Sequence, residues 1–152
     1  MKDNLLKYYN QTSTKANVIT VDWRELSAFI SDINLIANPI YFVAAKNTRD
    51  IVAPKLRDLL APFQSKTIMC IGHSLGGQTC GALGRLVSID VIHGLDPAGP
   101  AFDIGLYGLK KLNKGDAKFV SAIHSNKILF GTKVKRLFYF PHFLITILNP
   151  KF

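Results

Sequence analysis

Residues 69–78 read MCIGHSLGGQ and join a short apolar run to a stretch of small residues through the pattern G-x-S-x-G. In a nucleophile elbow, a serine lies on a sharp turn between a strand and a helix, where side chains two residues before or after it would collide with the neighbouring backbone. Gly72 and Gly76 remove these side chains on either side of Ser74. The pattern therefore predicts a strand, a tight turn that carries His73 and Ser74, and a helix.

The sequence on both sides of this turn fits the same interpretation. Thr67 to Ile71 is a short apolar run typical of a buried strand, and Gln78 to Leu86 is rich in small residues that suit a packed helix. The backbone N–H of Leu75 and the positive end of that helix are expected to face an oxyanion formed on a substrate carbonyl. The alternative interpretation is a glycine-rich turn with an incidental serine.

A second apolar run ends in an acidic residue. Residues 91–100 read VIHGLDPAGP, so Asp96 follows a predicted strand and precedes two prolines and a glycine. Because reactive groups in open α/β sheets gather outside the carboxyl ends of the strands, we expect Ser74 and Asp96 to share one site. An Asp-Pro pair also starts turns with no functional role, and the assignment of Asp96 therefore depends on Ser74 upstream.

Four stretches in one order resemble the animal lipase family, which includes pancreatic lipase, lipoprotein lipase and the insect and venom phospholipases A1. They are NVITVDW at residues 17–23, GHSLGG at 72–77, GLDPAGP at 94–100 and DAKFV at 116–120. The resemblance covers roughly Leu5 to Asn126. It implies hydrolysis of carboxylic ester bonds in glycerolipids, with Ser74 as nucleophile and Asp96 orienting the base. It does not separate a triacylglycerol lipase from a phospholipase A1.

The resemblance also implies the fold class, an α/β-hydrolase core with central parallel strands and flanking helices. A chain of 152 residues can bury one core, whereas the family's catalytic domain is longer. We therefore expect a partial core, truncated at both ends. Residues 1–132 form the expected partial lipase domain, and residues 133–152 form a divergent basic and apolar tail.

The remaining elements are predicted from periodicity and from the resemblance. We expect the end of a helix over residues 3–11 and strands over residues 17–22 and 119–123. A helix is expected within residues 40–63, interrupted or started by Pro54, with Asp50 or Thr48 as its cap.

A serine hydrolase also needs a general base. The resemblance places the catalytic histidine in a Cys-Ser-His stretch, and a second oxyanion donor in a His-Gly-aromatic loop, and neither is found in this sequence. His73 lies in the elbow, His93 lies within a predicted strand, and His124 matches a family position that is not the base. His142 keeps the chain order Ser, Asp, His and is the candidate substitute base. We expect weak or no esterase activity.

Charge and hydropathy indicate the partner class. The formal net charge of +9 favours anionic surfaces, either phospholipid or nucleic acid, and no nucleic-acid-binding motif accompanies it. We expect a lipid ester substrate, an anionic lipid surface as a further partner, and no nucleic acid. Residues 137–148 are apolar but shorter than the roughly 20 residues of a bilayer span. We expect them to form a loose strand or to lie on a membrane, with Lys133, Lys135 and Arg136 at the headgroups.

Cysteines and acidic residues bear on compartment and metal. Cys70 and Cys80 are expected to be buried as small apolar residues without a disulfide. Family resemblance implies an extracellular protein, although residues 1–6 contain no signal-peptide core. No cofactor is expected, and no metal either, because the positions that match a family calcium site offer a single carboxylate. Those positions are Gly99, Lys111, Asn113 and Asp116.

Two non-catalytic interpretations stay open. The first is a lipid-binding or yolk-type protein that keeps the lipase fold without turnover, although yolk-type relatives lose the nucleophile and Ser74 is retained here. The second is a basic protein that binds lipid surfaces through its charge and its tail. Vesicle binding that is sensitive to salt and survives Ser74→Ala would favour the second.

Overall fold

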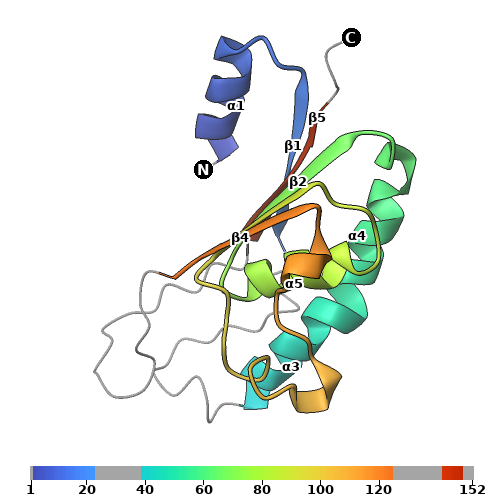
Figure 1. Cartoon of the computed structure of the whole chain (residues 1–152), viewed down its shortest axis with the longest axis vertical. Helices are drawn as coiled ribbons and strands as arrows, with labels where there is room; N and C mark the ends of the chain where they lie inside the picture. The colour runs from blue at the N-terminus through green and yellow to red at the C-terminus, as the bar shows by residue number, and fades with distance from the viewer. Residues whose placement is uncertain (1, 23–38, 125–141, 149–152) are drawn as a thin grey trace.

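The computed structural model of the chain describes residues 2–22, 39–124 and 142–148. Over these residues one sheet runs in the order β1-β5-β2-β3-β4 (Figure 1). The strands are β1 (Ala16–Asp22), β2 (Thr67–His73), β3 (Val91–Leu95), β4 (Phe119–Ile123) and β5 (His142–Leu148). Strand β3 pairs in parallel with both β2 and β4, whereas β5 runs antiparallel to β1 and to β2. The sheet is therefore parallel apart from its C-terminal strand.

Helices lie on both faces of this sheet. Figure 1 shows α1 (Lys2–Gln11) on one side, and α3 (Pro39–Asn47), α4 (Ala53–Leu60) and α5 (Leu75–Gly84) on the other. Short helical turns occupy Thr48–Val52, Ala61–Phe63, Leu106–Gly108 and Lys114–Asp116. The helix and the two strands expected over residues 3–11, 17–22 and 119–123 are confirmed as α1, β1 and β4.

The centre of the fold is the unit β2-α5-β3. Side chains along β2 alternate between buried and half-buried, as expected for a strand whose two faces differ in cover. Helix α5 begins at Leu75 rather than at Gln78, and every residue from Leu75 to Leu83 is buried. The absence of a side chain at Gly84 lets α5 pack closely against the backbone of Asp116, because a Cβ at Gly84 would lie 1.9 Å from the Asp116 carbonyl oxygen. The strand, turn and helix expected around Ser74 are confirmed.

The helix expected within residues 40–63 is divided into two. A π-helical turn joins α3 to α4, and Pro54 lies in the first turn of α4, where proline is tolerated. The expected cap is wrong, because no side chain caps α4. The Thr48 hydroxyl instead donates back to a carbonyl of α3 at 2.7 Å, and Asp50 pairs with Arg49. Such local side-chain bonds compete with capping.

Strand β5 confirms that part of the tail forms a strand and corrects the expectations that this strand is loose or that the tail lies on a membrane. It lies between β1 and β2, with Ile145 opposite Ile19 on one side and Cys70 on the other. Residues from Phe143 to Ile147 are at most 5% exposed. An apolar run with no polar face is typical of a strand covered on both faces, and the centre of this sheet provides that cover. The described part of the tail is therefore core.

Two further expectations concern the tail and membrane spans. Lys133, Lys135 and Arg136 lie outside the described residues. Among residues 2–22, 39–124 and 142–148, no helix has both the length and the apolar character that crossing a bilayer requires.

The two cysteines correct a second expectation. Cys70 of β2 and Cys80 of α5 are both fully buried, as expected, but they form a disulfide with a Cα–Cα distance of 5.9 Å. Helix α5 packs on the face of β2 to which Cys70 belongs, which brings the two Cα atoms within the range that a disulfide requires. The bond closes a ring of chain that contains Ser74.

Candidate functional site

Ser74 lies on the turn between β2 and α5 in a backbone conformation that non-glycine residues rarely adopt, with φ 54° and ψ −121°. Hydrogen bonds hold the turn on both sides. The Ser74 N–H donates to the carbonyl of Leu95 at 3.0 Å, and the Ser74 carbonyl accepts from the N–H groups of Gly77 at 3.1 Å and Ala98 at 3.2 Å. The elbow is thereby bonded to the end of β3 and to the loop that follows it.

Gly72 is required by this turn for a steric reason. A Cβ at Gly72 would lie 2.3 Å from the carbonyl carbon and from the carbonyl oxygen of Gly76. Real Cβ contacts do not reach such distances, so a larger residue would force the strand away from the helix. Gly72 and Gly76 meet where the sequence predicts them to meet, before and after Ser74.

Asp96 is a second strained residue at the same edge of the sheet. Its φ is 43°, and its N–H donates to the carbonyl of Ile123 at 2.7 Å. His73 and Leu95 are register partners in β2 and β3, so Ser74 and Asp96 each follow directly after a paired position. The structure thus brings the backbones of the predicted nucleophile and acid together at the carboxyl ends of adjacent strands, the usual location of a site in such sheets.

Gln78 is a supporting residue that the sequence analysis did not single out. Its side chain is 3% exposed, donates to the carbonyl of Ala98 at 2.6 Å and accepts from the N–H of Leu112 at 2.7 Å. It therefore braces the loop after Asp96 against α5. The signal in the sequence is a lone amide among the small, buried residues that follow Ser74.

The histidines of the described region have different environments. Burial holds the pKa of His73 below its usual range, and the charge of Asp96 opposes this shift. His93 Nδ1 lies 2.6 Å from the Ser121 hydroxyl, which ties β3 to β4. His124 is exposed at the end of β4. The half-buried imidazole of His73 thus belongs to the residue directly before Ser74, and its lowered pKa favours the neutral form.

His142 is placed by its backbone alone. It is the first residue of β5 and lies opposite Asp22, and the next residue, Phe143, lies opposite Gly72. Because β5 is antiparallel, it starts at the edge where β2 ends. The backbone of the candidate substitute base is therefore at the same edge as Ser74, and its side chain lies outside the described residues.

The residues matched to a calcium site make protein contacts. The carboxylate of Asp116, 5% exposed, accepts from Arg85 at 2.7 Å and from the N–H of Asn113 at 2.9 Å. Lys111 pairs with Asp103 at 3.7 Å. Asp116 thus caps the turn Lys114–Asp116 and anchors the end of α5 through Arg85. In the part of the chain that the structure describes, no three His, Cys, Asp or Glu side chains form a metal cluster. That calcium does not bind remains a prediction.

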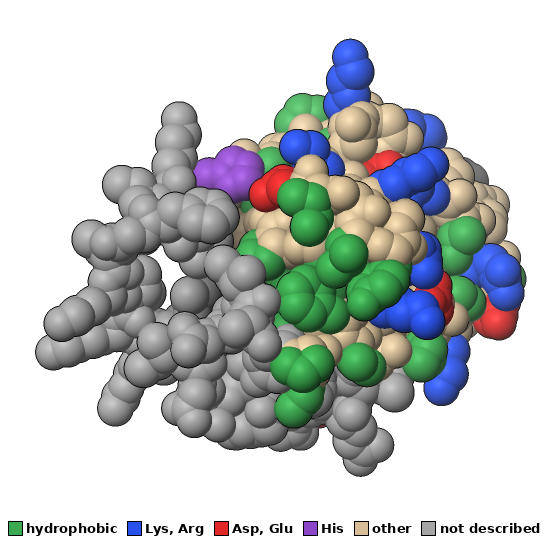
Figure 2. Space-filling view, turned by 90° about the horizontal axis from the view of Figure 1, so that it is seen from below, with side chains coloured by type: hydrophobic (Ala, Val, Ile, Leu, Met, Phe, Trp, Pro, Cys, Tyr) green, Lys and Arg blue, Asp and Glu red, His purple; other side chains and the backbone are tan. Residues whose placement is uncertain are grey.

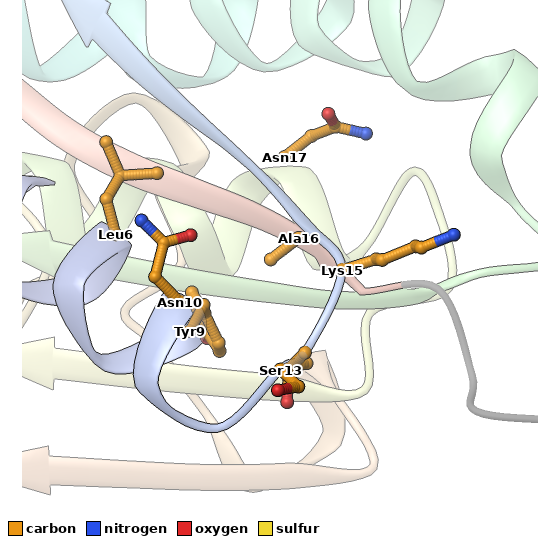
Figure 3. Close-up of a pocket in the computed structure, with 8 residues that line it drawn as sticks. Leu6, Tyr9, Asn10, Ser13, Lys15, Ala16 and Asn17 are labelled. Carbon is orange, nitrogen blue, oxygen red and sulfur yellow. The ribbon is translucent and has the colours of Figure 1, made fainter.

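A hollow of about 510 Å³ lies away from Ser74, between α1 and the start of β1 (Figure 3). Its lining comes from Leu6, Tyr9, Asn10, Ser13, Thr14, Lys15, Ala16 and Asn17. Burial raises the pKa of Tyr9, and a hydrogen-bond interaction with Thr146 of β5 opposes the shift. This hollow is at the amino end of the parallel strands, opposite to the edge that carries Ser74 and Asp96.

Comparison with known proteins decides the family. The family model described as Lipase matches residues 1–141. The chain belongs to the Lipase family. Three curated relatives of this lipase-family chain are phospholipases A1 from Polybia paulista and Vespa basalis, with 36% and 34% identity, and hepatic triacylglycerol lipase from Mus musculus, with 36% identity. The matches cover 74%, 87% and 76% of the chain, respectively. No solved structure matches it.

Membership of the Lipase family identifies the observed sheet as part of an α/β-hydrolase core. The chain spans 38%, 47% and 22% of the lengths of these three relatives. The family match ends at residue 141, directly before β5 begins. The central unit β2-α5-β3 therefore lies within the matched region, whereas the strand between β1 and β2 lies outside it.

Proposed function

We propose that this chain carries the nucleophile part of a serine hydrolase for carboxylic ester bonds of glycerolipids. The observation that carries the proposal is the pair of strained backbones, Ser74 at the end of β2 and Asp96 at the end of β3. Conformations of this kind cost about 1–3 kcal/mol each and cluster at functional sites. The relatives are named as phospholipase A1 and triacylglycerol lipase, which supports the substrate class.

The proposed roles follow from the elbow. The Ser74 hydroxyl attacks the ester carbonyl while a base takes its proton, and the tetrahedral oxyanion receives a hydrogen bond from the N–H of Leu75, the first residue of α5. Collapse of this intermediate expels the alcohol, and water then cleaves the acyl-serine to release a fatty acid. Asp96 orients the base and stabilises its protonated form.

The strength of the activity depends on the base. We expect feeble turnover, because no histidine matches the family's catalytic one and the second oxyanion donor is not found in the sequence. Loss of one oxyanion donor alone typically costs about 10²–10³-fold in kcat. His142 is the candidate that would change this expectation, since its backbone is at the edge that carries Ser74.

Labelling tests the nucleophile independently of turnover. A fluorophosphonate should label the folded chain on Ser74, detected by peptide mass, and Ser74→Ala should abolish the label. Ser121→Ala, in β4, is the matched control and should keep it. A folded chain that is never labelled at Ser74 contradicts the proposal and favours a lipid-binding or yolk-type protein without turnover.

Hydrolysis of p-nitrophenyl butyrate tests the base. The purified chain should show little activity above the Ser74→Ala variant. Robust turnover that is abolished by both Ser74→Ala and His142→Ala would show that His142 acts as the base, and the expectation of weak activity would then be wrong.

The disulfide supports an oxidising compartment, and we propose an extracellular location on that basis. Disulfides persist in secreted and surface proteins and are rare in the cytosol. Cys70 and Cys80 are joined in this structure, and the described residues contain no free cysteine. Thiol titration of the unreduced, denatured protein from its native source should detect no free thiol. Two reactive thiols would contradict the proposed location.

A further inference from the structure

Four exposed apolar residues lie at the end of the molecule where α3 meets the turn after β3. They are Ile104, 77% exposed, Tyr107, 63%, Val43, 56%, and Ile40, 43%. We call these four residues the apolar patch. Figure 1 shows α3 beside the turn Leu106–Gly108, and Figure 2, which views this end of the molecule, shows hydrophobic side chains gathered near the centre of the face. Contiguous exposed apolar surface of this kind marks an interaction site more often than scattered residues do.

Hydrogen bonds fix the two halves of the patch to each other. The hydroxyl of Tyr41, in α3, donates to the carbonyl of Pro100 at 2.9 Å. Arg49 donates to the carbonyl of Tyr107 at 2.6 Å. Both bonds join the segment 39–52 to the segment 96–108, so the turn is held against the helix. The patch is therefore part of the folded core's surface and not a loose loop.

The backbone holds Tyr107 in the exposed position. Its φ is 54°, in the left-handed region that residues with a side chain rarely adopt, and it lies between Gly105 at 62° and Gly108 at 70°. A relaxed turn could bury an aromatic ring against neighbouring apolar residues, and this one presents it to solvent. Retained strain that exposes a large side chain indicates a surface contact for that side chain.

Basic side chains border the apolar patch on one side (Figure 2). Segments 39–50 and 101–111 contain Lys46, Arg49, Lys110 and Lys111 against the acids Asp50 and Asp103. Arg49 is paired closely with Asp50, whereas the Lys46–Asp50 and Lys111–Asp103 pairs are long, at 3.8 and 3.7 Å, and exposed pairs of this kind bind weakly. Figure 2 shows Lys and Arg side chains along one margin of the hydrophobic area. The combination of an apolar centre and a cationic margin complements an anionic lipid surface.

We propose that the apolar patch docks this chain onto anionic phospholipid surfaces. Ile104 and Tyr107 enter the boundary between headgroups and acyl chains, and Lys110 and Lys111 remain among the headgroup phosphates. The loop that carries the patch begins at Asp96 and is bonded to the elbow through Ala98, so the docked face adjoins the edge with Ser74. The link between docking and catalysis rests on the proposed function, whereas docking itself does not require Ser74.

Co-sedimentation of the full chain with vesicles tests the inference. Vesicles of phosphatidylcholine containing phosphatidylglycerol should bind the chain, and the partition coefficient should fall with added salt and with omission of phosphatidylglycerol. Ile104→Ser with Tyr107→Ser should weaken binding by about ten-fold or more, because each change removes apolar area from the lipid contact. Tyr8→Ser with Ile123→Ser is the matched control, since these residues are 59% and 58% exposed outside the patch, and it should bind as the wild type does.

Charge is tested separately. Lys110→Glu with Lys111→Glu should weaken binding to the anionic vesicles by several-fold. Lys7→Glu with Lys2→Glu, on α1 at the other end of the molecule in Figure 1, makes the same change in net charge and should have a smaller effect. Equal losses for the two pairs would show that total charge and not this surface drives binding, and the proposal would be wrong.

The failure of docking and the failure of the proposed function give different results. Ser74→Ala should bind vesicles as the wild type does. Intact Ser74 labelling with no vesicle binding overturns the docking surface alone, and vesicle binding without labelling overturns the hydrolase alone. Analytical ultracentrifugation tests whether a second copy of the chain covers the apolar patch instead. A dimer that Ile104→Ser disrupts would show this and overturn the proposal.

Discussion

The elbow unit β2-α5-β3 and the C-terminal strand β5 are neighbours in one sheet, yet different kinds of contact determine their positions. In the elbow, residues close in sequence determine the turn, since Gly72 and Gly76 meet within one strand-turn-helix. In β5, every ladder contact joins residues far apart in the chain, such as Ile145 with Cys70 and Ile19. The elbow also lies within the Lipase family match, and β5 lies outside it.

A partial α/β core requires that each of its inner strands has a hydrogen-bonding neighbour on both sides. Strand β5 pairs with both β1 and β2 in the described sheet, and it is more deeply buried than β2, whose side chains alternate between buried and half-buried. An unpaired strand flanked by helices would leave backbone groups without partners, so an apolar segment that can reach the gap is stabilised there. The tail is therefore buried because the sheet offers it a place between two strands. Substitutions in β5 and in the elbow should show whether both regions contribute similarly to the stability of the fold.

The largest effect is expected for Ile145→Asp in the centre of β5. Ile145 is fully buried, so the substitution places a carboxylate in the core and should lower the free energy of unfolding by about 4 kcal/mol. Ile123→Asp, at a position 58% exposed in β4, should change it by less than about 0.5 kcal/mol. Urea denaturation measures both variants. Equally small losses for the two variants would show that β5 is not a core strand and that it contributes less to stability than the elbow does.

Gly72→Ala tests the elbow in the same way. The new Cβ would collide with the carbonyl of Gly76 and should cost about 3 kcal/mol of stability. Gly115→Ala is the control, because its Cβ would lie 4.0 Å from the Asn113 side chain. The comparison is read from urea midpoints, and a neutral Gly72→Ala variant would contradict the observed approach of β2 to α5.

Loss of the disulfide should have a smaller effect. The bond joins residues separated by 10 positions, and a loop of that size predicts a loss of about 2 to 3 kcal/mol in the Cys70→Ala, Cys80→Ala variant. Reduced wild-type protein, unfolded in urea with dithiothreitol, separates the cross-link from the lost side-chain packing. Identical midpoints for oxidised and reduced wild type would show that the bond does not stabilise the elbow.

Acid should weaken the elbow through His73. Burial lowers the pKa of His73 in the folded chain, so its contribution to stability is present above the unfolded value of about 6.5 and is lost as pH falls toward the lower folded pKa. His73→Gln should flatten this part of the stability profile, measured by urea midpoints across mildly acidic pH. His124→Gln, at an exposed position, should leave the profile unchanged. If the stability of His73→Gln falls with decreasing pH as steeply as that of the wild type, His73 is not the cause of the pH dependence.

The smallest effect is expected from calcium, which should leave Tm unchanged. Asp116 is the single carboxylate among the matched positions, and this carboxylate already accepts hydrogen bonds from Arg85 and from the backbone N–H of Asn113. A ligand that binds only the folded state raises Tm by an amount that grows with the logarithm of its concentration relative to its Kd. A rise of several degrees with millimolar calcium, absent with magnesium, would show a calcium site and contradict this prediction.

Local sequence patterns were sufficient to predict the elbow and its surroundings. Glycine spacing, the apolar run before Ser74 and the small residues after it predicted the strand, the turn and the helix, and the same logic placed Asp96 at the end of the next strand. These features depend on neighbours a few residues away, and local sterics and periodicity encode such neighbours directly. The helix within residues 40–63 was predicted in part, since Pro54 indicated the break but the cap was wrong.

Contacts between distant segments could not be predicted from the sequence and are seen only in the folded chain. The bond between Cys70 and Cys80 depends on which side of α5 faces β2, and the pairing of Asp116 with Arg85 depends on where the loop after β3 returns to α5. The position of β5 depends on a gap between β1 and β2 that exists only once the sheet has formed. Such contacts join residues with no shared local pattern, because their free energy comes from area buried and hydrogen bonds formed across the whole fold.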